Sequence, residues 1–123
     1  MEKILHKELS YQIVGAAMEV HSTLGSGFLE KVYENALLYE LELRNLKAIA
    51  QLPLQVLYKG NVVGDYIADI FVEDKIILEL KAIKAIHDVH VAQAINYLTA
   101  TGLKLAIILN FGSDKLESKR VIR

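Results

Sequence analysis

Residues 62–83 read VVGDYIADIFVEDKIILELKAI, and this stretch decides the fold because it holds two strand patterns around a short polar turn. Val62–Val72 and Ile76–Ile83 are rich in β-branched, aromatic and other apolar residues, which favours extended structure. Glu73-Asp74-Lys75 supplies a three-residue loop between them. The stretch therefore predicts an antiparallel hairpin.

Three charged residues, Asp69, Glu79 and Lys81, interrupt this otherwise apolar hairpin. If Val72 pairs with Ile76, counting back along both strands pairs Asp69 with Glu79 and brings their Cβ atoms to about 4.5–5.5 Å. Like charges in this position are destabilising, so a compensating cation is expected. Lys81 shares a strand face with Glu79 and partly neutralises the pair, whereas a divalent cation would neutralise it more fully.

On spacing alone two interpretations of these charges stay open. One is a metal site built on the paired carboxylates. The other is a solvent-facing strand that alternates apolar and charged residues without any chemistry. A register slip of one residue would also remove the direct opposition of Asp69 and Glu79.

The sequence before the hairpin predicts two helices and a strand. Apolar residues recur every three or four positions over Glu8–Leu24 and again over Phe28–Arg44. His21 is expected to cap or pack the first helix. Leu54–Tyr58 alternates as a strand, with Pro53 at its start or on a sheet edge.

After the hairpin, the sequence predicts a helix with Asp88 as its N-cap and with its C-terminus near Gly102. The apolar strand Leu103–Phe111 follows. A strand, a helix and a strand in this order imply a right-handed crossover and a last strand parallel to the third. The predicted fold class is α/β (α+β), a mixed four-stranded sheet flanked by helices in the order α-α-β-β-β-α-β.

Length and composition limit the remaining possibilities. The 123 residues fit one domain over 1–123, and 53% apolar residues with 24% charged ones indicate a packed globular protein. Fourteen Lys and Arg against fifteen Asp and Glu give a net charge of −1, so any nucleic-acid partner needs a local basic patch. The absence of Cys excludes disulfides and thiolate metal sites. Since no apolar run approaches the roughly 18 residues that span a bilayer, we expect a cytoplasmic protein.

The charged residues of the hairpin carry a resemblance to a known superfamily. Asp69, nine residues, Glu79, one residue and Lys81 resemble the catalytic signature of the PD-(D/E)XK nucleases. Ala68 stands where Pro precedes the Asp in the signature. The restriction-endonuclease-like core of these proteins, α-β-β-β-α-β, matches the predicted order. Residues 93–97, QAINY, resemble the Gln-x-x-x-Tyr motif of the RecB-like exonuclease branch.

A narrower resemblance covers nearly the whole chain. Residues 27–33, GFLEKVY, match the Gly-x-x-Glu-x-x-Tyr pattern of the GxxExxY proteins, a bacterial and archaeal group assigned to the same superfamily. Residues 20–27, Glu79–Ala82 and Asn110-Phe111-Gly112 are also similar to that group. The resemblance implies a metal-dependent phosphodiesterase acting on DNA, with RNA not excluded, and with a role in repair, recombination or defence.

The resemblance also implies a role for each residue of the signature. Asp69 and Glu79 would bind Mg²⁺ or Mn²⁺, with the backbone carbonyl of Leu80 as a further ligand. Lys81 would position or deprotonate the attacking water, stabilise the developing charge, or serve only as a structural counterion.

The two flanking helices are expected to contribute further residues to this site. Glu30 would help to hold a metal-bound water or a second ion, and Glu34, one turn on, could substitute for it. Gln93 would contact a phosphate or Lys81. Tyr97 would hydrogen-bond or stack on a base. Packing is the alternative role for Gln93 and Tyr97.

The candidate phosphate-contacting residues are the basic ones outside the motifs, which are otherwise simply solvated: Lys84, Lys104, Lys115, Lys119, Arg120 and Arg123. A homodimer or a partner protein could supply targeting. The alternative function is a catalytically silent nuclease fold that binds nucleic acid or protein.

Overall fold

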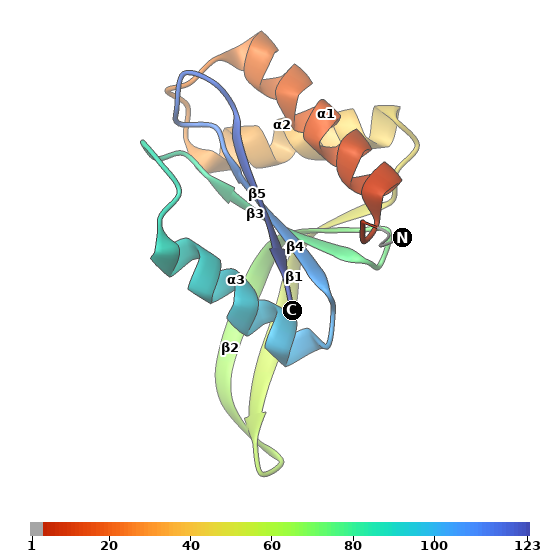
Figure 1. Cartoon of the computed structure of the whole chain (residues 1–123), viewed down its shortest axis with the longest axis vertical. Coiled ribbons are helices and arrows are strands. Elements are labelled where there is room, and N and C mark those ends of the chain that lie inside the picture. Colours follow the sequence, from red (N-terminus) through yellow and green to blue (C-terminus); the bar gives the residue numbers. More distant parts are fainter. Residues whose placement is uncertain (1–3) are drawn as a thin grey trace.

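One sheet separates two helical layers in the computed structural model, which describes residues 4–123 (Figure 1). The sheet has five strands in the order β1-β2-β3-β4-β5. The elements are α1 (Lys7–Leu24), α2 (Glu30–Leu43), β1 (Ala48–Tyr58), β2 (Asn61–Val72), β3 (Ile76–Lys81), α3 (Asp88–Thr101), β4 (Leu105–Asn110) and β5 (Glu117–Ile122). No helix in the described part of the chain is long and apolar enough to cross a membrane.

The central hairpin has the register that its turn predicts. Val72 pairs with Ile76, and the antiparallel ladder between β2 and β3 continues to Ile70 and Leu78. Lys75 N–H donates to Val72 O at 3.0 Å and closes the three-residue loop. The parallel pairing of β3 with β4 is also confirmed, and α3 forms the crossover between them.

The sheet has one strand more than the four predicted. β5 (Glu117–Ile122) pairs antiparallel with β4. Its sequence, ESKRVI, has no clear alternation of apolar and polar residues, and Val121 is its one buried residue. β1 also begins at Ala48 rather than Leu54, and β3 ends at Lys81 rather than Ile83. Pro53 lies inside β1, and its place on an edge strand is as predicted because β1 is the first strand of the sheet.

Apolar side chains form a core on each face of the sheet. α1 and α2 cover one face, and α3 covers the other. β3 and β4 are buried on both faces, which explains their continuous apolar runs. Fully burying one such side chain contributes about 1.5–3 kcal/mol to the free energy of unfolding. The α1/α2-side core includes Ile13, Leu37, Ile70, Leu78 and Ile107, and the α3-side core includes Ile77, Ala94, Leu98, Ala106 and Ile108.

The strands β1 and β2 are irregular around Gln51 and Asp69. Ile70 packs in the α1/α2-side core but Ala68 packs in the α3-side core, although residues two apart normally share a face. Asp69 lies between them, and Gln51 in β1 has a φ of 58° at the level where the two strands would pair. This irregularity is where the charged residues gather.

Candidate active site

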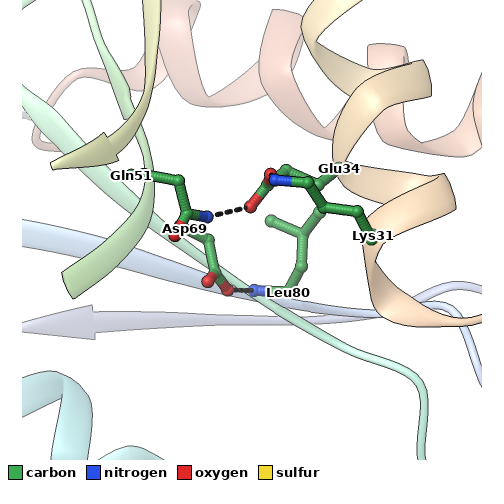
Figure 2. Close-up of polar contacts among 5 residues, drawn as sticks. All are labelled: Lys31, Glu34, Gln51, Asp69 and Leu80. Atoms are coloured by element: carbon green, nitrogen blue, oxygen red, sulfur yellow. Dashed lines mark hydrogen bonds and ion pairs between the residues drawn. The ribbon is translucent and has the colours of Figure 1, made fainter.

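Asp69 lies at the point where β2 separates from β3. The backbone ladder ends at Ile70 and Leu78, so the predicted pairing of Asp69 with Glu79 is wrong, and the Asp69 carboxylate instead bonds to the β3 backbone. Asp69 Oδ2 accepts a hydrogen bond from Leu80 N–H at 2.8 Å (Figure 2). Burial raises the pKa of Asp69, and the Leu80 hydrogen bond offsets part of that rise. The β3 backbone therefore fixes this carboxylate in place.

A cavity of about 250 Å³ opens beside Asp69 toward α2. Glu30 and Glu34 both line it, together with Lys31, Gln51, Asp69 and Leu80. Glu34 is only 4% exposed, whereas Glu30 is exposed. Gln51 Nε2 donates to Glu34 Oε1 at 2.5 Å, and Lys31 Nζ lies 2.5 Å from Glu34 Oε2 (Figure 2). Of the two α2 carboxylates, Glu34 is the one that neighbouring side chains hold in the cavity.

Glu79 lies on the α3 side of β3, because it shares a strand face with Ile77 of that core. It is 6% exposed, and its Oε1 is buried with no hydrogen-bond partner among the described residues. Burial, followed by the negative charge of Asp69, raises the pKa of Glu79 to about 8. A hydrogen bond from the Asp69 backbone and, to a smaller extent, the positive charge of Lys81 lower the pKa of Glu79 but do not cancel these effects. The positive charge near Asp69 and Glu79 therefore does not balance their two negative charges.

Gln93 and Tyr97 lie one turn apart on α3. Gln93 Nε2 donates to Tyr97 Oη at 3.1 Å, so the contact that the structure shows for Gln93 is within the helix rather than with Lys81. Burial and the charges of Glu79 and Asp69 raise the pKa of Tyr97 to about 12. Tyr97 is thus close enough to the carboxylates to respond to them.

Tyr33 and Gly27 of the GxxExxY stretch shape the turn before α2. Tyr33 Oη donates to Gly25 O at 2.6 Å, and the Tyr33 ring stacks on Phe111 with centroids 4.6 Å apart. Gly27 has a φ of 110°, which favours glycine. His21 packs as predicted, and its Nε2 lies 3.0 Å from Ser113 O. These contacts fix the turn that precedes α2 and thereby place Glu34.

Asn110 has a role that the sequence patterns do not reveal. Its amide is fully buried and forms two 3.0 Å hydrogen bonds with the backbone N–H and C=O of Ile83. Asn110 Nδ2 also donates to Glu117 Oε1 at 3.0 Å. A Cβ atom on Gly112 would lie 2.3 Å from the Ile83 backbone, so this position must be glycine. The similarity of Asn110-Phe111-Gly112 to the GxxExxY group marks these positions in the sequence but does not reveal their contacts.

The basic residues do not form one patch. Arg120 donates to Ser10 Oγ at 2.5 Å and to Leu5 O at 2.8 Å, which ties β5 to the α1 side. Lys119, its neighbour in β5, lines a cavity with His87 on the α3 side. Consecutive strand residues point to opposite faces, so a common phosphate-binding surface over all six predicted positions is wrong.

The fit of a divalent cation can be judged from the carboxylates. Within residues 4–123, no group of three or more His, Cys, Asp or Glu side chains is arranged to hold a metal ion. Mg²⁺ sites, however, commonly use one or two carboxylates and complete the shell with water and substrate phosphate. The unpartnered Glu79 Oε1 and the raised pKa of Glu79 show a local need for positive charge. Asp69 and Glu79 therefore fit a hard cation held partly by water and substrate.

Comparison with known proteins identifies a family for this chain. A family model described as the PD-(D/E)XK nuclease superfamily matches residues 7–121. The crystal structure of SSO0001 is similar in fold, with 18% identity and a TM-score of 0.57. The match covers 96% of this chain and 57% of SSO0001, so the chain spans little more than half of that protein.

A second solved structure, an alkaline exonuclease (LHK-Exo) from Laribacter hongkongensis, is 11% identical with a TM-score of 0.46. That match covers 100% of this chain and 72% of the exonuclease. Comparison with functionally curated proteins gives no match. Because the family model spans almost the entire sequence, the chain belongs to the PD-(D/E)XK nuclease superfamily.

Proposed function

We propose that the protein is a Mg²⁺- or Mn²⁺-dependent nuclease that hydrolyses phosphodiester bonds of DNA. Its superfamily membership supports a nuclease-type function. The observation that carries the metal dependence is the buried Glu79 Oε1, which lacks a hydrogen-bond partner in residues 4–123 and lies near a second carboxylate, Asp69. A pair of this kind is stabilised by a cation and destabilised without one.

Asp69 and Glu79 would hold the cation from two strands, and the carbonyl of Leu80 would be a further ligand. When bound, the cation supplies Lewis-acid polarisation of the phosphodiester and lowers the pKa of a water molecule. The Leu80 N–H orients the Asp69 carboxylate through its 2.8 Å hydrogen bond. The backbone of one residue, Leu80, would thus serve both carboxylate positioning and ligation.

Lys81 and the α3 pair would act on the substrate. The Lys81 ammonium, on the same strand face as Glu79, would orient the attacking water and stabilise charge on the phosphate. Tyr97 keeps its proton at neutral pH because its pKa is about 12, so its hydroxyl can donate to a phosphate oxygen. Gln93 holds that hydroxyl in place.

Glu34 is our choice for the acidic contribution from α2. Its burial and its two partners, Lys31 and Gln51, fix the carboxylate in the cavity beside Asp69. Glu30 lines the same cavity but is exposed. Membership of the GxxExxY group and a RecB-like relationship are further parts of the proposal, and the sequence motifs support both. The proposal also includes homodimer formation and a cytoplasmic location, which no motif supports.

The test is cleavage of linear single-stranded, linear duplex and supercoiled DNA by purified protein with Mg²⁺ or Mn²⁺. Asp69→Asn and Lys81→Ala should each reduce the cleavage rate at least about 100-fold. Asp74→Asn is the matched control, because this exposed Asp lies in the β2–β3 turn and its ion pair with Lys47 is solvated. Glu34→Gln should lose more activity than Glu30→Gln.

Cleavage that persists in both Asp69→Asn and Lys81→Ala would assign the activity to another site or a contaminant. Nucleic-acid binding that is indifferent to EDTA, without any cleavage, would instead favour the catalytically silent module. Circular dichroism of each variant establishes that a loss of activity is not a loss of fold.

A further inference from the structure

Another cavity, of about 520 Å³, lies between α3 and the β1–β2 hairpin. In Figure 1 this hairpin extends beyond the rest of the molecule, past the α3 layer. The cavity residues that matter here are Gln55 and Leu57 from β1, Tyr66 from β2 and Asn96 from α3. None of the proposed metal-binding residues lines this cavity.

The hairpin is irregular beside this cavity. The register between β1 and β2 shifts between Val56 and Leu57, and such a bulge re-aims the side chains around it. Gly64 pairs with Val56 and has no side chain. A Cβ atom at Gly64 would lie 3.4 Å from the Tyr66 ring, so the glycine leaves space beside that ring.

The cavity offers an aromatic surface beside hydrogen-bonding amides. Tyr66 is 43% exposed, so part of its ring is available for stacking. Gln55 and Asn96 are exposed, and each amide has donors and an acceptor. No Lys or Arg is among the residues lining this cavity, so it has no cation for a phosphate. A planar, neutral, hydrogen-bonding ring, such as a nucleobase, fits these groups best.

Tyr97 connects the cavity to the candidate active site. The Tyr66 and Tyr97 ring centroids are 5.7 Å apart. Tyr97 in turn is close enough to Glu79 and Asp69 for their charges to raise its pKa. Tyr97 is therefore near both Tyr66, which lines the cavity, and the carboxylates, so the cavity adjoins the candidate active site.

We propose that this cavity binds an unpaired base of single-stranded DNA adjacent to the phosphate that is cleaved. The inference rests on the proposed nuclease function and adds a substrate class to it. A base within a duplex is stacked and paired, and it would have to leave the stack to reach Tyr66. The cavity thus favours single strands, frayed ends or flaps over intact duplex.

The test measures binding in EDTA, where metal-dependent cleavage does not occur. Fluorescence anisotropy follows a labelled single-stranded oligodeoxynucleotide and, separately, its blunt duplex. Tyr66→Ala should weaken binding of the single strand on the order of ten-fold, since it removes one stacking surface. Binding of the duplex should change less than about two-fold, and Tyr66→Phe should retain single-strand binding because it keeps the ring.

Tyr11→Ala is the matched control, because Tyr11 is 79% exposed on α1, across the sheet from α3. Equal single-strand binding by Tyr66→Ala and Tyr11→Ala would overturn the assignment, as would equal losses for single strand and duplex in Tyr66→Ala. A wild-type protein that binds no single strand would also overturn it. So would a change of oligomeric state in Tyr66→Ala with unaltered DNA binding, which would make the hairpin a protein interface.

The two proposals can fail separately. Single-strand binding that depends on Tyr66, in a protein that cuts no DNA with any metal, would support the cavity and contradict the nuclease function. Metal-dependent cleavage with Tyr66-independent binding would do the reverse. Thermal melting of Tyr66→Ala and Tyr66→Phe controls for loss of fold.

Discussion

Glu79 has the least favourable surroundings for a charge of the residues in the candidate site. Its carboxylate is buried, one oxygen has no partner in the described part of the chain, and Asp69 adds a second negative charge nearby. A buried carboxylate in this position either takes up a proton or gains a cation. Without a metal ion Glu79 takes up a proton, as its pKa of about 8 indicates. Cation binding should release that proton.

The buried Glu79 carboxyl should make the stability of the protein depend on pH. The folded protein holds the Glu79 proton up to about pH 8, whereas an ordinary Glu loses it near 4.5. Between these values the folded state binds more protons than the unfolded state, so the free energy of unfolding should fall as pH rises. The slope from one proton is at most about 1.4 kcal/mol per pH unit. The raised pKa of Asp69 acts in the same direction.

Urea denaturation in EDTA at several pH values measures this slope. Glu79→Gln should flatten the dependence because it removes the titrating group, while Glu19→Gln, at an exposed position of α1, should leave it unchanged. A wild-type stability that is constant from about pH 5 to 8 would show that Glu79 is not held protonated in the fold.

The residues of the site differ in how well sequence reveals them. Asp69, Glu79 and Lys81 are visible because charges in an apolar hairpin demand an explanation. Gln51 is not visible, because its contact with Glu34 depends on a φ of 58° that no strand pattern indicates. The choice of Glu34 over Glu30 likewise depends on the helix rotation set by packing.

At the scale of elements, the ends of β3 and β4 are joined by a buried amide. Asn110 binds the backbone of Ile83 on both its N–H and C=O groups, and Phe111 N–H donates to Lys81 O at 2.8 Å. These bonds hold the segment that follows Lys81 against the end of β4. The position of Lys81 in the site therefore depends on the neighbouring strand.

Asn110→Ala should destabilise the fold by about 1–3 kcal/mol, since it leaves the half-buried N–H and C=O groups of Ile83 unpaired. It should also lower DNA cleavage under conditions where the variant is still folded, because Lys81 loses its support. Urea denaturation and the cleavage assay measure the two effects. Asn35→Ala, on the exposed side of α2, is the control. Stability equal to that of the control would contradict a supporting role for Asn110.

The sequence predicts a helix or strand correctly where neighbouring residues in the chain determine it. The Glu73-Asp74-Lys75 turn fixes the hairpin register, and the apolar runs of β3 and β4 identify buried strands. β5 was missed because it is an edge strand with one buried residue, Val121, and its pairing depends on β4 rather than on its own sequence. The irregularity at Asp69 is likewise a property of three strands together.

For the whole molecule, the sheet divides the candidate functions between its faces. The cavity beside Glu34 opens toward α2, and Tyr97 with the hairpin cavity lies toward α3. Asp69, at the gap between β2 and β3, is the residue common to both sides. The net charge of −1 includes these acidic groups, so a bound cation would make the local field more favourable to DNA.

The most direct test of the central claim is the anomalous scattering of a crystal soaked with Mn²⁺. We predict a manganese peak about 2.1 Å from a carboxylate oxygen of both Asp69 and Glu79, with the Leu80 carbonyl in the same coordination shell. No manganese near either carboxylate, with the Lys81 ammonium lying between them instead, would contradict the claim that this pair is a metal centre.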